Sequence, residues 1–345
     1  MPWDEGLVNS LVYDRPDPGE GRVMSYVGAI NEALTIALDS DPSVLVLGQG
    51  VDDPSAMFGT TRGLQDRFGL RRVFDTPLSE EAMMGVSAGA AMNGMRPVYM
   101  HNRPDFVLLA FNQLVTHAPK FHFMDNGQTT VPMVVWAAIG RGWGSGAQHS
   151  QAIHGMLLGV PGLKIVMPST PHDAKGLLLA AIMDNNPVCV FEHRWLMKKD
   201  GVVPERPYRV PIGKGICRRR GRDLTIVGAS HAIELGAQAA ALLASEGIEA
   251  EVIDLRTIKP LDESIVLESL HRTGRLLVVD TAWATGGVCA EVGCLAAEKG
   301  FRDLKAPVGR VGLPDAPAPA GFTLEQFYYP DAPRIAEAAR GLMRA

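Results

Sequence analysis

Two adjacent carboxylates, Glu80 and Glu81, are the side chains in this sequence whose chemistry is easiest to place. They follow the segment Asp75–Ser79 and precede a Gly/Ala-rich stretch, 82–93, that is typical of a helix. Ser79 is expected to cap this helix by accepting a backbone N–H, and acidic residues are favoured in a first turn because the helix dipole is positive there. Both acids therefore have a structural explanation, and a catalytic role needs support from the surrounding segments.

Polar residues near the ends of predicted strands form a second group of candidates. Loops after strands are where α/β sheets bind ligands. His149 lies between a Gly-rich segment, 140–146, and the next predicted helix, while His101 and Arg103 follow the predicted strand 97–100. These positions suit contact with a substrate, and a solvated loop explains them as well.

The Gly-rich segment 140–146 resembles a dinucleotide-binding fingerprint. That fingerprint also needs an acidic residue about 20 residues later. Val166-Met167-Pro168 occupies this place, so a turn with close backbone approach is favoured over NAD binding. The sequence has no P-loop, and its histidines and cysteines lack metal-binding spacing.

Bulk properties favour a cytoplasmic globular protein of two or three domains. The chain has 345 residues, a net charge of −5 and a pI near 6.0, so it lacks the basic surplus that binds nucleic acid. No apolar run approaches the roughly 18 residues of a membrane span, and the N-terminus lacks the pattern of a signal peptide. Four cysteines without a Cys-x-x-Cys pair fit a reducing compartment.

Apolar strands and helices alternate along the chain in two blocks. The first has predicted strands at 44–47, 73–74, 97–100, 131–138, 163–167 and 188–191, and helices at 25–38, 79–93, 105–118 and 171–185. The second has strands at 224–227, 250–253, 275–279 and 308–311, and helices at 231–244, 263–270, 287–299 and 333–343. Such alternation indicates parallel sheets covered by helices on both faces.

The sequence thus predicts an α/β protein with two parallel-sheet domains, residues 22–197 and a smaller domain at 222–345. Residues 1–21 are polar and carry two prolines, which suggests an N-terminal arm. The stretch 198–221 is basic and contains prolines, which suggests a linker with a solvated face.

Several short motifs occur together in a distinctive order. They are Asp75–Glu80, Gly85–Pro97, Gln148–Gln151, Pro161–Pro168, Asp173–Leu178, Asp184–Pro187 and, in the second block, Val252–Asp262. In this order they resemble the β subunit of the thiamine-diphosphate-dependent component of 2-oxoacid dehydrogenase complexes, of the pyruvate and branched-chain types. The resemblance implies a transketolase-like pyrimidine-binding domain followed by a transketolase C-terminal domain.

The resemblance implies roles for three side chains. Glu80 would hydrogen-bond N1′ of the thiamine diphosphate pyrimidine and so favour the imino tautomer, whose exocyclic nitrogen takes the proton from the thiazolium C2. Phe106 would pack on the pyrimidine ring, although an ordinary core aromatic is the structural alternative. His149 would serve the 2-oxoacid or acyl-acceptor step, and Glu81 keeps the role of a helix-start charge.

The resemblance also implies a partner chain and metal ions. The family's motif for diphosphate and Mg²⁺, Gly-Asp-Gly followed by Asn, does not occur in the sequence. A separate α subunit would therefore supply these ligands in a heterotetramer of two α and two β subunits. Oxygens of five further residues would surround a potassium ion: Met133, Ala181, Ile182, Asp184 and Asn186. From the residues alone, Asp184–Pro187 is a helix-stop signal.

Two segments depart from the family pattern. Met100–Phe106 replaces an apolar stretch, and Glu192–Leu196 replaces a more usual acidic or neutral run. Because the first segment carries His101 and Arg103, a substrate more polar or anionic than pyruvate is expected.

The first functional hypothesis is an oxidoreductase subunit that decarboxylates a 2-oxoacid and passes the acyl unit to an acceptor, such as the lipoyl group of a lipoyl acyltransferase. The alternatives are a two-subunit carboligase or transketolase-like enzyme, and a non-catalytic β-like subunit.

Overall fold

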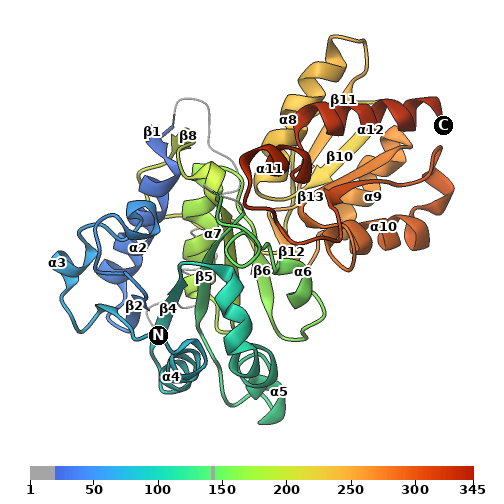
Figure 1. The fold of residues 1–345 in the computed structure, drawn as a ribbon. Helices are drawn as coiled ribbons and strands as arrows, with labels where there is room; N and C mark the ends of the chain where they lie inside the picture. The colour runs from blue at the N-terminus through green and yellow to red at the C-terminus, as the bar shows by residue number, and fades with distance from the viewer. Residues whose placement is uncertain (1–19, 141–143) are drawn as a thin grey trace. The chain divides into compact units, whose positions relative to one another are not determined.

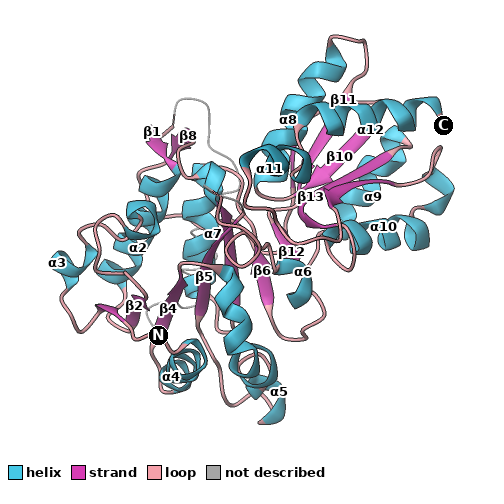
Figure 2. Cartoon of the chain, viewed as in Figure 1, coloured by secondary structure: helices cyan, strands magenta, loops and turns pink. Residues whose placement is uncertain are grey.

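The computed structural model describes residues 20–140 and 144–345, which divide into two compact units (Figure 1). Unit 1 holds the residues up to 139 together with 159–212, and unit 2 holds 140–158 and 213–345. Most of the expected arm, 1–21, lies outside the described residues. In both units, helices and strands alternate along the chain, as Figure 2 shows.

Unit 1 is built on a parallel sheet. Its strands are β1 (Arg22–Ser25), β2 (Val44–Gly48), β3 (Val73–Asp75), β4 (Arg96–His101), β5 (Val134–Ile139), β6 (Lys164–Val166), β7 (Val188–His193) and β8 (Asp200–Val203). The main sheet has the order β6-β7-β5-β4-β2-β3 with all these pairs parallel, while β1 and β8 form a separate antiparallel pair.

Helices cover both faces of this sheet (Figure 1). The elements are α2 (Tyr26–Ser40), η1 (Ala56–Gly59), α3 (Leu64–Phe68), α4 (Glu80–Met92), η2 (Pro104–Ala110), η3 (Asn112–His117), α5 (Phe121–Met124), α7 (Pro171–Met183) and η4 (Arg194–Leu196). The main core lies where α2 and α7 meet one face, and α7 is buried on all sides because α2 and the 208–210 segment cover it. On the other face, α4 packs with η2 and η3.

Two expected elements of unit 1 differ from the structure. The helix expected at 105–118 is a 3₁₀-helix, η2, followed by the π-helix η3, in which Ala118 N–H donates to Gln113 O five residues earlier at 2.9 Å. Over one or two turns, apolar spacing does not distinguish helices with three, 3.6 or more residues per turn. The strand expected at 131–138 begins at Val134, because Pro132 has no N–H for the sheet.

Unit 2 is a smaller α/β unit. Its elements are α6 (His154–Leu157), β9 (Ile216–Arg219), β10 (Leu224–Gly228), α8 (His231–Ala244), β11 (Ala250–Asp254), β12 (Thr257–Lys259), α9 (Glu263–Thr273), β13 (Leu276–Trp283), α10 (Val288–Lys299), η5 (Phe301–Asp303), β14 (Gly309–Leu313), α11 (Phe322–Tyr328) and α12 (Ala332–Arg344). The sheet order is β14-β13-β10-β11-β9, parallel except for the edge strand β9. Helices α8 and α12 pack on one face around the apolar core.

The stretch 198–221, expected as a linker, contains β8 and β9. β8 pairs with β1, and β9 pairs with β11. No helix in the described part of the chain is long and apolar enough to span a membrane.

Helix α7 supplies a test of the packing in unit 1. A Cβ added at Gly176 would lie 2.6 Å from Val210 Cγ2, 2.8 Å from Tyr208 Cε2 and 3.0 Å from Val210 N. We expect Gly176→Ala to lower the free energy of unfolding by about 1–3 kcal/mol, because a rigid backbone and a packed ring must shift. Chemical denaturation measures this change.

The control is Gly341→Ala on α12, where an added Cβ has no atom within 4 Å. A helical glycine with free space should gain about 0.5–1 kcal/mol on replacement by alanine. Equal stabilities for the two variants would contradict the described packing of α7.

Candidate active site

Glu80 lies in the first turn of α4 and is buried, with 9% of the residue exposed. Its Oε1 accepts a hydrogen bond from Nε2 of Gln49 at 3.2 Å. Ser79 occupies the N-cap position, but its side chain makes no cap hydrogen bond, so the expected serine cap does not form. Its ψ of 69° differs from the extended conformation that aims a capping side chain at the helix. The helix terminus itself still favours a carboxylate at Glu80.

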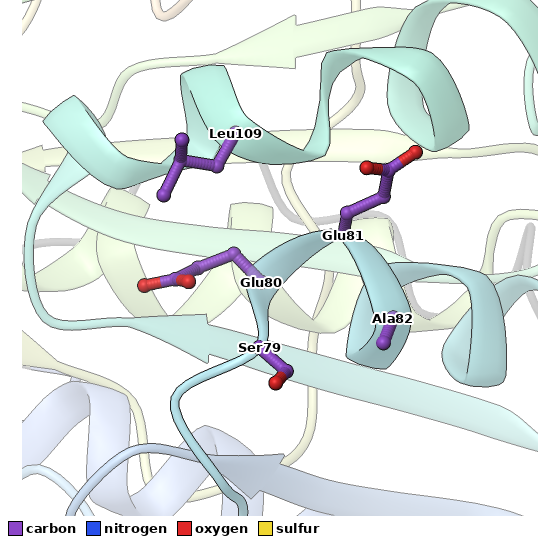
Figure 3. A pocket seen from close by; sticks show the side chains of 5 residues that line it. All are labelled: Ser79, Glu80, Glu81, Ala82 and Leu109. Carbon is purple, nitrogen blue, oxygen red and sulfur yellow. The ribbon is translucent and has the colours of Figure 1, made fainter.

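The two adjacent acids point to different sides of the start of α4. Figure 3 shows the Glu80 carboxylate and the Leu109 side chain on one side, and the Glu81 carboxylate on the other. Glu81 is exposed, and its Oε1 accepts from Nδ2 of Asn112 at 3.1 Å. A cavity of about 550 Å³ adjoins this helix start and is lined by Ser79, Glu80, Glu81, Ala82 and Leu109.

The loops that follow β2, β3 and β4 are tied together beside Glu80. These strands are neighbours in the parallel sheet, so their carboxyl ends meet at one edge. Besides its bond to Glu80, Gln49 accepts at its backbone oxygen from Nδ2 of Asn102 at 3.0 Å. The next backbone N–H, of Gly50, donates to Oδ1 of Asp75 at 2.6 Å. One polar network therefore holds three loops.

Tyr99 and His101 form a buried aromatic pair at the end of β4, with ring centroids 4.3 Å apart. Burial lowers the pKa of His101 to about 3, so this imidazole is neutral throughout the physiological range. Burial, reinforced by the charge of Glu80, raises the pKa of Tyr99 to about 12. Among the residues that the structure describes, neither the Tyr99 hydroxyl nor Nε2 of His101 has a hydrogen-bond partner.

Arg103 and Phe106 follow on the same loop, and both are half-buried. Burial lowers the pKa of the Arg103 guanidinium, against the opposing effect of the Asp105 charge. Within the described part of the chain, this guanidinium donates no hydrogen bond. A half-buried guanidinium that donates no hydrogen bond to the described residues suits an anionic ligand. Phe106 lies in the 3₁₀-helix η2.

The second segment that departs from the family pattern, Glu192–Leu196, ends β7 and enters the 3₁₀ turn η4. All of its residues are buried except Trp195. Burial raises the pKa of Glu192 well above its usual range, which favours a neutral carboxylic acid.

His149 belongs to unit 2, whereas Glu80 belongs to unit 1. It is half-buried, and its backbone N–H donates to Gly146 O at 3.4 Å. The flanking Gly140, Gly144 and Gly146 have positive φ, as expected for a tight turn; residues 141–143 of the Gly-rich segment lie outside the described residues.

The residues expected around potassium gather where α7 passes into β7. Met133 O accepts from Val188 N at 3.0 Å, which places it beside this turn. The buried guanidinium of Arg96 donates to Ile182 O at 2.8 Å and to Asp184 O at 2.9 Å. The Asp184 carboxylate accepts from Asn186 N and pairs with Lys164. Two of the expected ligand oxygens therefore already accept from a cation.

Sequence reasoning missed Gln49, Tyr99 and Asn102 as parts of this site. Each lies at or just beyond the carboxyl end of a predicted parallel strand, which is the signal that could have identified them. Among the described residues, no cluster of three His, Cys, Asp or Glu side chains could hold a metal ion.

Two family models match the chain, and their boundary falls near the passage from unit 1 to unit 2 at residues 212–213. Residues 22–199 match the family "Transketolase, pyrimidine binding domain", and residues 213–335 match "Transketolase, C-terminal domain". A solved structure of a split gene transketolase, an inactive beta4 tetramer, superposes with a TM-score of 0.74 at 22% identity, covering 93% of this chain and 98% of that chain. At this identity the likeness shows the fold alone.

Curated relatives are more similar in sequence. The chain is 41% identical over 322 residues to the 2-oxoisovalerate dehydrogenase subunit beta of Bacillus subtilis, covering 93% of this chain and 98% of the relative. It is 40% identical over 326 residues to the acetoin:2,6-dichlorophenolindophenol oxidoreductase subunit beta of the same organism, covering 91% and 95%.

The pyruvate dehydrogenase E1 component subunit beta of Acholeplasma laidlawii is 38% identical over 325 residues, with 94% of this chain and 99% of the relative covered. The chain therefore belongs to the family of β subunits of thiamine-diphosphate-dependent 2-oxoacid dehydrogenases, in which a transketolase pyrimidine-binding domain precedes a transketolase C-terminal domain.

Proposed function

We propose that this chain is the β subunit of an enzyme that uses thiamine diphosphate to decarboxylate a 2-oxoacid and transfer the resulting acyl unit. The observation that carries this proposal is the buried carboxylate of Glu80, which lies at the start of α4 beside a cavity. A non-catalytic β-like role leaves this buried carboxylate without a purpose, because burying a charge costs free energy.

The residues present fit the pyrimidine end of the cofactor. One oxygen of Glu80 is held by Gln49, and the carboxylate points to the Leu109 side of the helix start (Figure 3). Phe106, on the neighbouring loop, offers an aromatic ring for stacking on the pyrimidine. Thiamine diphosphate supplies a nucleophilic thiazolium carbon and an electron sink after decarboxylation.

The contribution of this chain is to hold a proton at one place. Glu80 would hydrogen-bond N1′ of the pyrimidine and share a proton with it, as the general acid–base group for the cofactor. The start of α4 fixes the backbone of Glu80, and the buried surroundings strengthen its electrostatic interactions. His149 would serve the oxoacid or the acyl-acceptor step.

A partner chain must complete this site. The sequence lacks the Gly-Asp-Gly motif, and the described residues contain no acidic or histidine cluster for a metal. We propose that an α subunit supplies the ligands of the diphosphate and Mg²⁺, in a heterotetramer of two α and two β subunits. A lipoyl acyltransferase would then receive the acyl unit. The four free cysteines accord with a reducing, cytoplasmic compartment.

The substrate is proposed to be a 2-oxoacid that carries a further polar or anionic group. Arg103 offers a half-buried guanidinium without a hydrogen bond to the described residues, and His101 offers a neutral imidazole. A carboligase or transketolase-like reaction is the second candidate. It is favoured by the polar loop, because sugar phosphates also combine hydroxyls with an anionic group.

A potassium ion is proposed at the turn between α7 and β7. Carbonyl oxygens of Met133, Ala181 and Ile182 and oxygens of Asp184 and Asn186 would be its ligands. A carbonyl oxygen has two lone pairs, so those that accept from Arg96 retain one for an ion. The neighbouring guanidinium would weaken the binding of a second cation.

Replacing each of the two adjacent acids by glutamine, one at a time, tests the role of Glu80. We expect Glu80→Gln to lower turnover of the reconstituted α/β pair about 10²–10⁴-fold, because the amide cannot share a proton with N1′. The assay is 2-oxoacid-dependent reduction of an artificial electron acceptor. The matched control is Glu81→Gln, which should retain turnover within a few-fold. Unchanged turnover in Glu80→Gln would refute the assignment.

Calorimetry tests the need for a partner. The isolated chain should give no binding heat at thiamine diphosphate and Mg²⁺ concentrations that saturate the α/β pair, because this chain would hold the pyrimidine end alone. Tight binding by the isolated chain would show that the diphosphate ligands lie within it.

Comparing KM for 2-oxoacids with and without a distal carboxylate tests the proposed role of Arg103. With Arg103→Gln, KM should rise about 10–100-fold for 2-oxoglutarate, whose distal carboxylate loses a charged hydrogen bond, and change only a few-fold for pyruvate. Because the pKa of His101 is about 3, the imidazole is uncharged above pH 5, and this contrast should not vary between pH 5 and 8. An equal rise for both substrates would place Arg103 away from the distal group.

A further inference from the structure

We propose that Gln49 is a positioning residue for Glu80: its amide fixes one carboxylate oxygen so that the other is presented to the ligand. This inference rests on the proposed function, since it concerns how the carboxylate assigned to the cofactor is held. Gln49 directly follows β2 and belongs to none of the motifs that the sequence analysis identified.

The chemistry of the contact fixes its direction. An ionised carboxylate only accepts hydrogen bonds, so the amide nitrogen of Gln49 must face Glu80, as the 3.2 Å contact between Nε2 and Oε1 has it. A neutral amide donates this hydrogen bond without placing a second charge beside Glu80. A lysine at this place would instead form an ion pair with the carboxylate.

The backbone of Gln49 is held on both sides of its side chain. Its carbonyl oxygen accepts from Asn102 Nδ2 at 3.0 Å, and the following N–H, of Gly50, donates to Asp75 Oδ1 at 2.6 Å. Before it, Gly48 approaches β4 so closely that an added Cβ would lie 2.3 Å from Met100 O. Because these contacts fix the backbone, the amide has a restricted reach and a defined aim.

No other side chain takes this place in the described part of the chain. Tyr99 is close enough for the charge of Glu80 to contribute to the raised pKa of its hydroxyl, yet that hydroxyl has no hydrogen-bond partner among the described residues. The side-chain donor to Glu80 is therefore Gln49. Asn102 also links Gln49 to the loop of His101 and Arg103, so the same residue relates the cofactor carboxylate to the proposed substrate loop.

Two variants of Gln49 separate positioning from a general structural role. Gln49→Met is close in size and removes the donor, whereas Gln49→Glu replaces the amide by a carboxyl group that can donate only while protonated. The control is Gln238→Met on α8. It removes a bond from Gln238 Nε2 to Glu234 Oε1 of the same length, 3.2 Å, between exposed side chains.

The measurements are thiamine diphosphate affinity by calorimetry and the pH profile of kcat, both on the α/β pair. Gln49→Met should weaken affinity and lower kcat about 10–100-fold at every pH, which is the range for a lost hydrogen bond to a charged group. Gln49→Glu should bind almost as the wild type at acidic pH, where the two carboxyl groups share a proton. Its affinity should then fall as pH rises, because two adjacent carboxylates repel. Gln238→Met should match the wild type.

The outcomes distinguish this inference from the proposed function. If the wild-type pair neither binds thiamine diphosphate nor depends on Glu80, the proposed function fails. If Glu80→Gln is inactive but both Gln49 variants match Gln238→Met, the role of Gln49 is overturned. If Gln49→Glu loses thiamine diphosphate affinity equally at every pH, the role of Gln49 is also overturned. Damage to the fold alone would lower affinity without adding a pH dependence. Should Gln49→Met fail to fold, the pH dependence of Gln49→Glu decides.

Discussion

Glu80 places a carboxylate where only 9% of the residue is exposed, and the surrounding structure must compensate that charge. Two features do so: the positive end of α4 and the amide of Gln49. Both depend on the parallel order of β2, β3 and β4, which brings the loops after these strands to one edge. Asp75 and Asn102 then fix the loop of Gln49 from either side. The sheet order is thus the condition for a buried, oriented acid.

Much of this arrangement follows from the sequence, and particular residues show where it stops. Alternating apolar strands and helices predicted two parallel sheets, and the helix start at 80 was expected within a residue. The helix expected over 105–118 became 3₁₀ and π turns, because short apolar spacing does not fix the helical pitch. Gln49 belongs to no sequence motif. Its contact with Glu80 could not be predicted, because it depends on loops that are distant in sequence and meet only in the folded chain. β8 and β9 were not expected, because they lie in a basic, proline-bearing stretch. Their pairing strands, β1 and β11, lie elsewhere in the sequence.

The family scaffold and the chemistry of the site are separable in this chain. Both transketolase domains match, and the relatives are β subunits of two dehydrogenases and of an acetoin oxidoreductase. At the end of β4 lies a neutral His101, and the half-buried Arg103 follows in the next loop. A common fold can present one cofactor to different substrates, because binding residues often lie on loops rather than in the sheet.

We propose that this chain holds the pyrimidine end of thiamine diphosphate through Glu80, with a partner chain holding the diphosphate. A crystal structure of the reconstituted α/β pair with thiamine diphosphate and Mg²⁺ would show which chain holds each end of the cofactor. We expect a hydrogen bond between a Glu80 oxygen and N1′ of the pyrimidine, with Gln49 on the other oxygen and all Mg²⁺ ligands outside this chain. A pyrimidine bound to another carboxylate, or Mg²⁺ ligated by this chain, would contradict it.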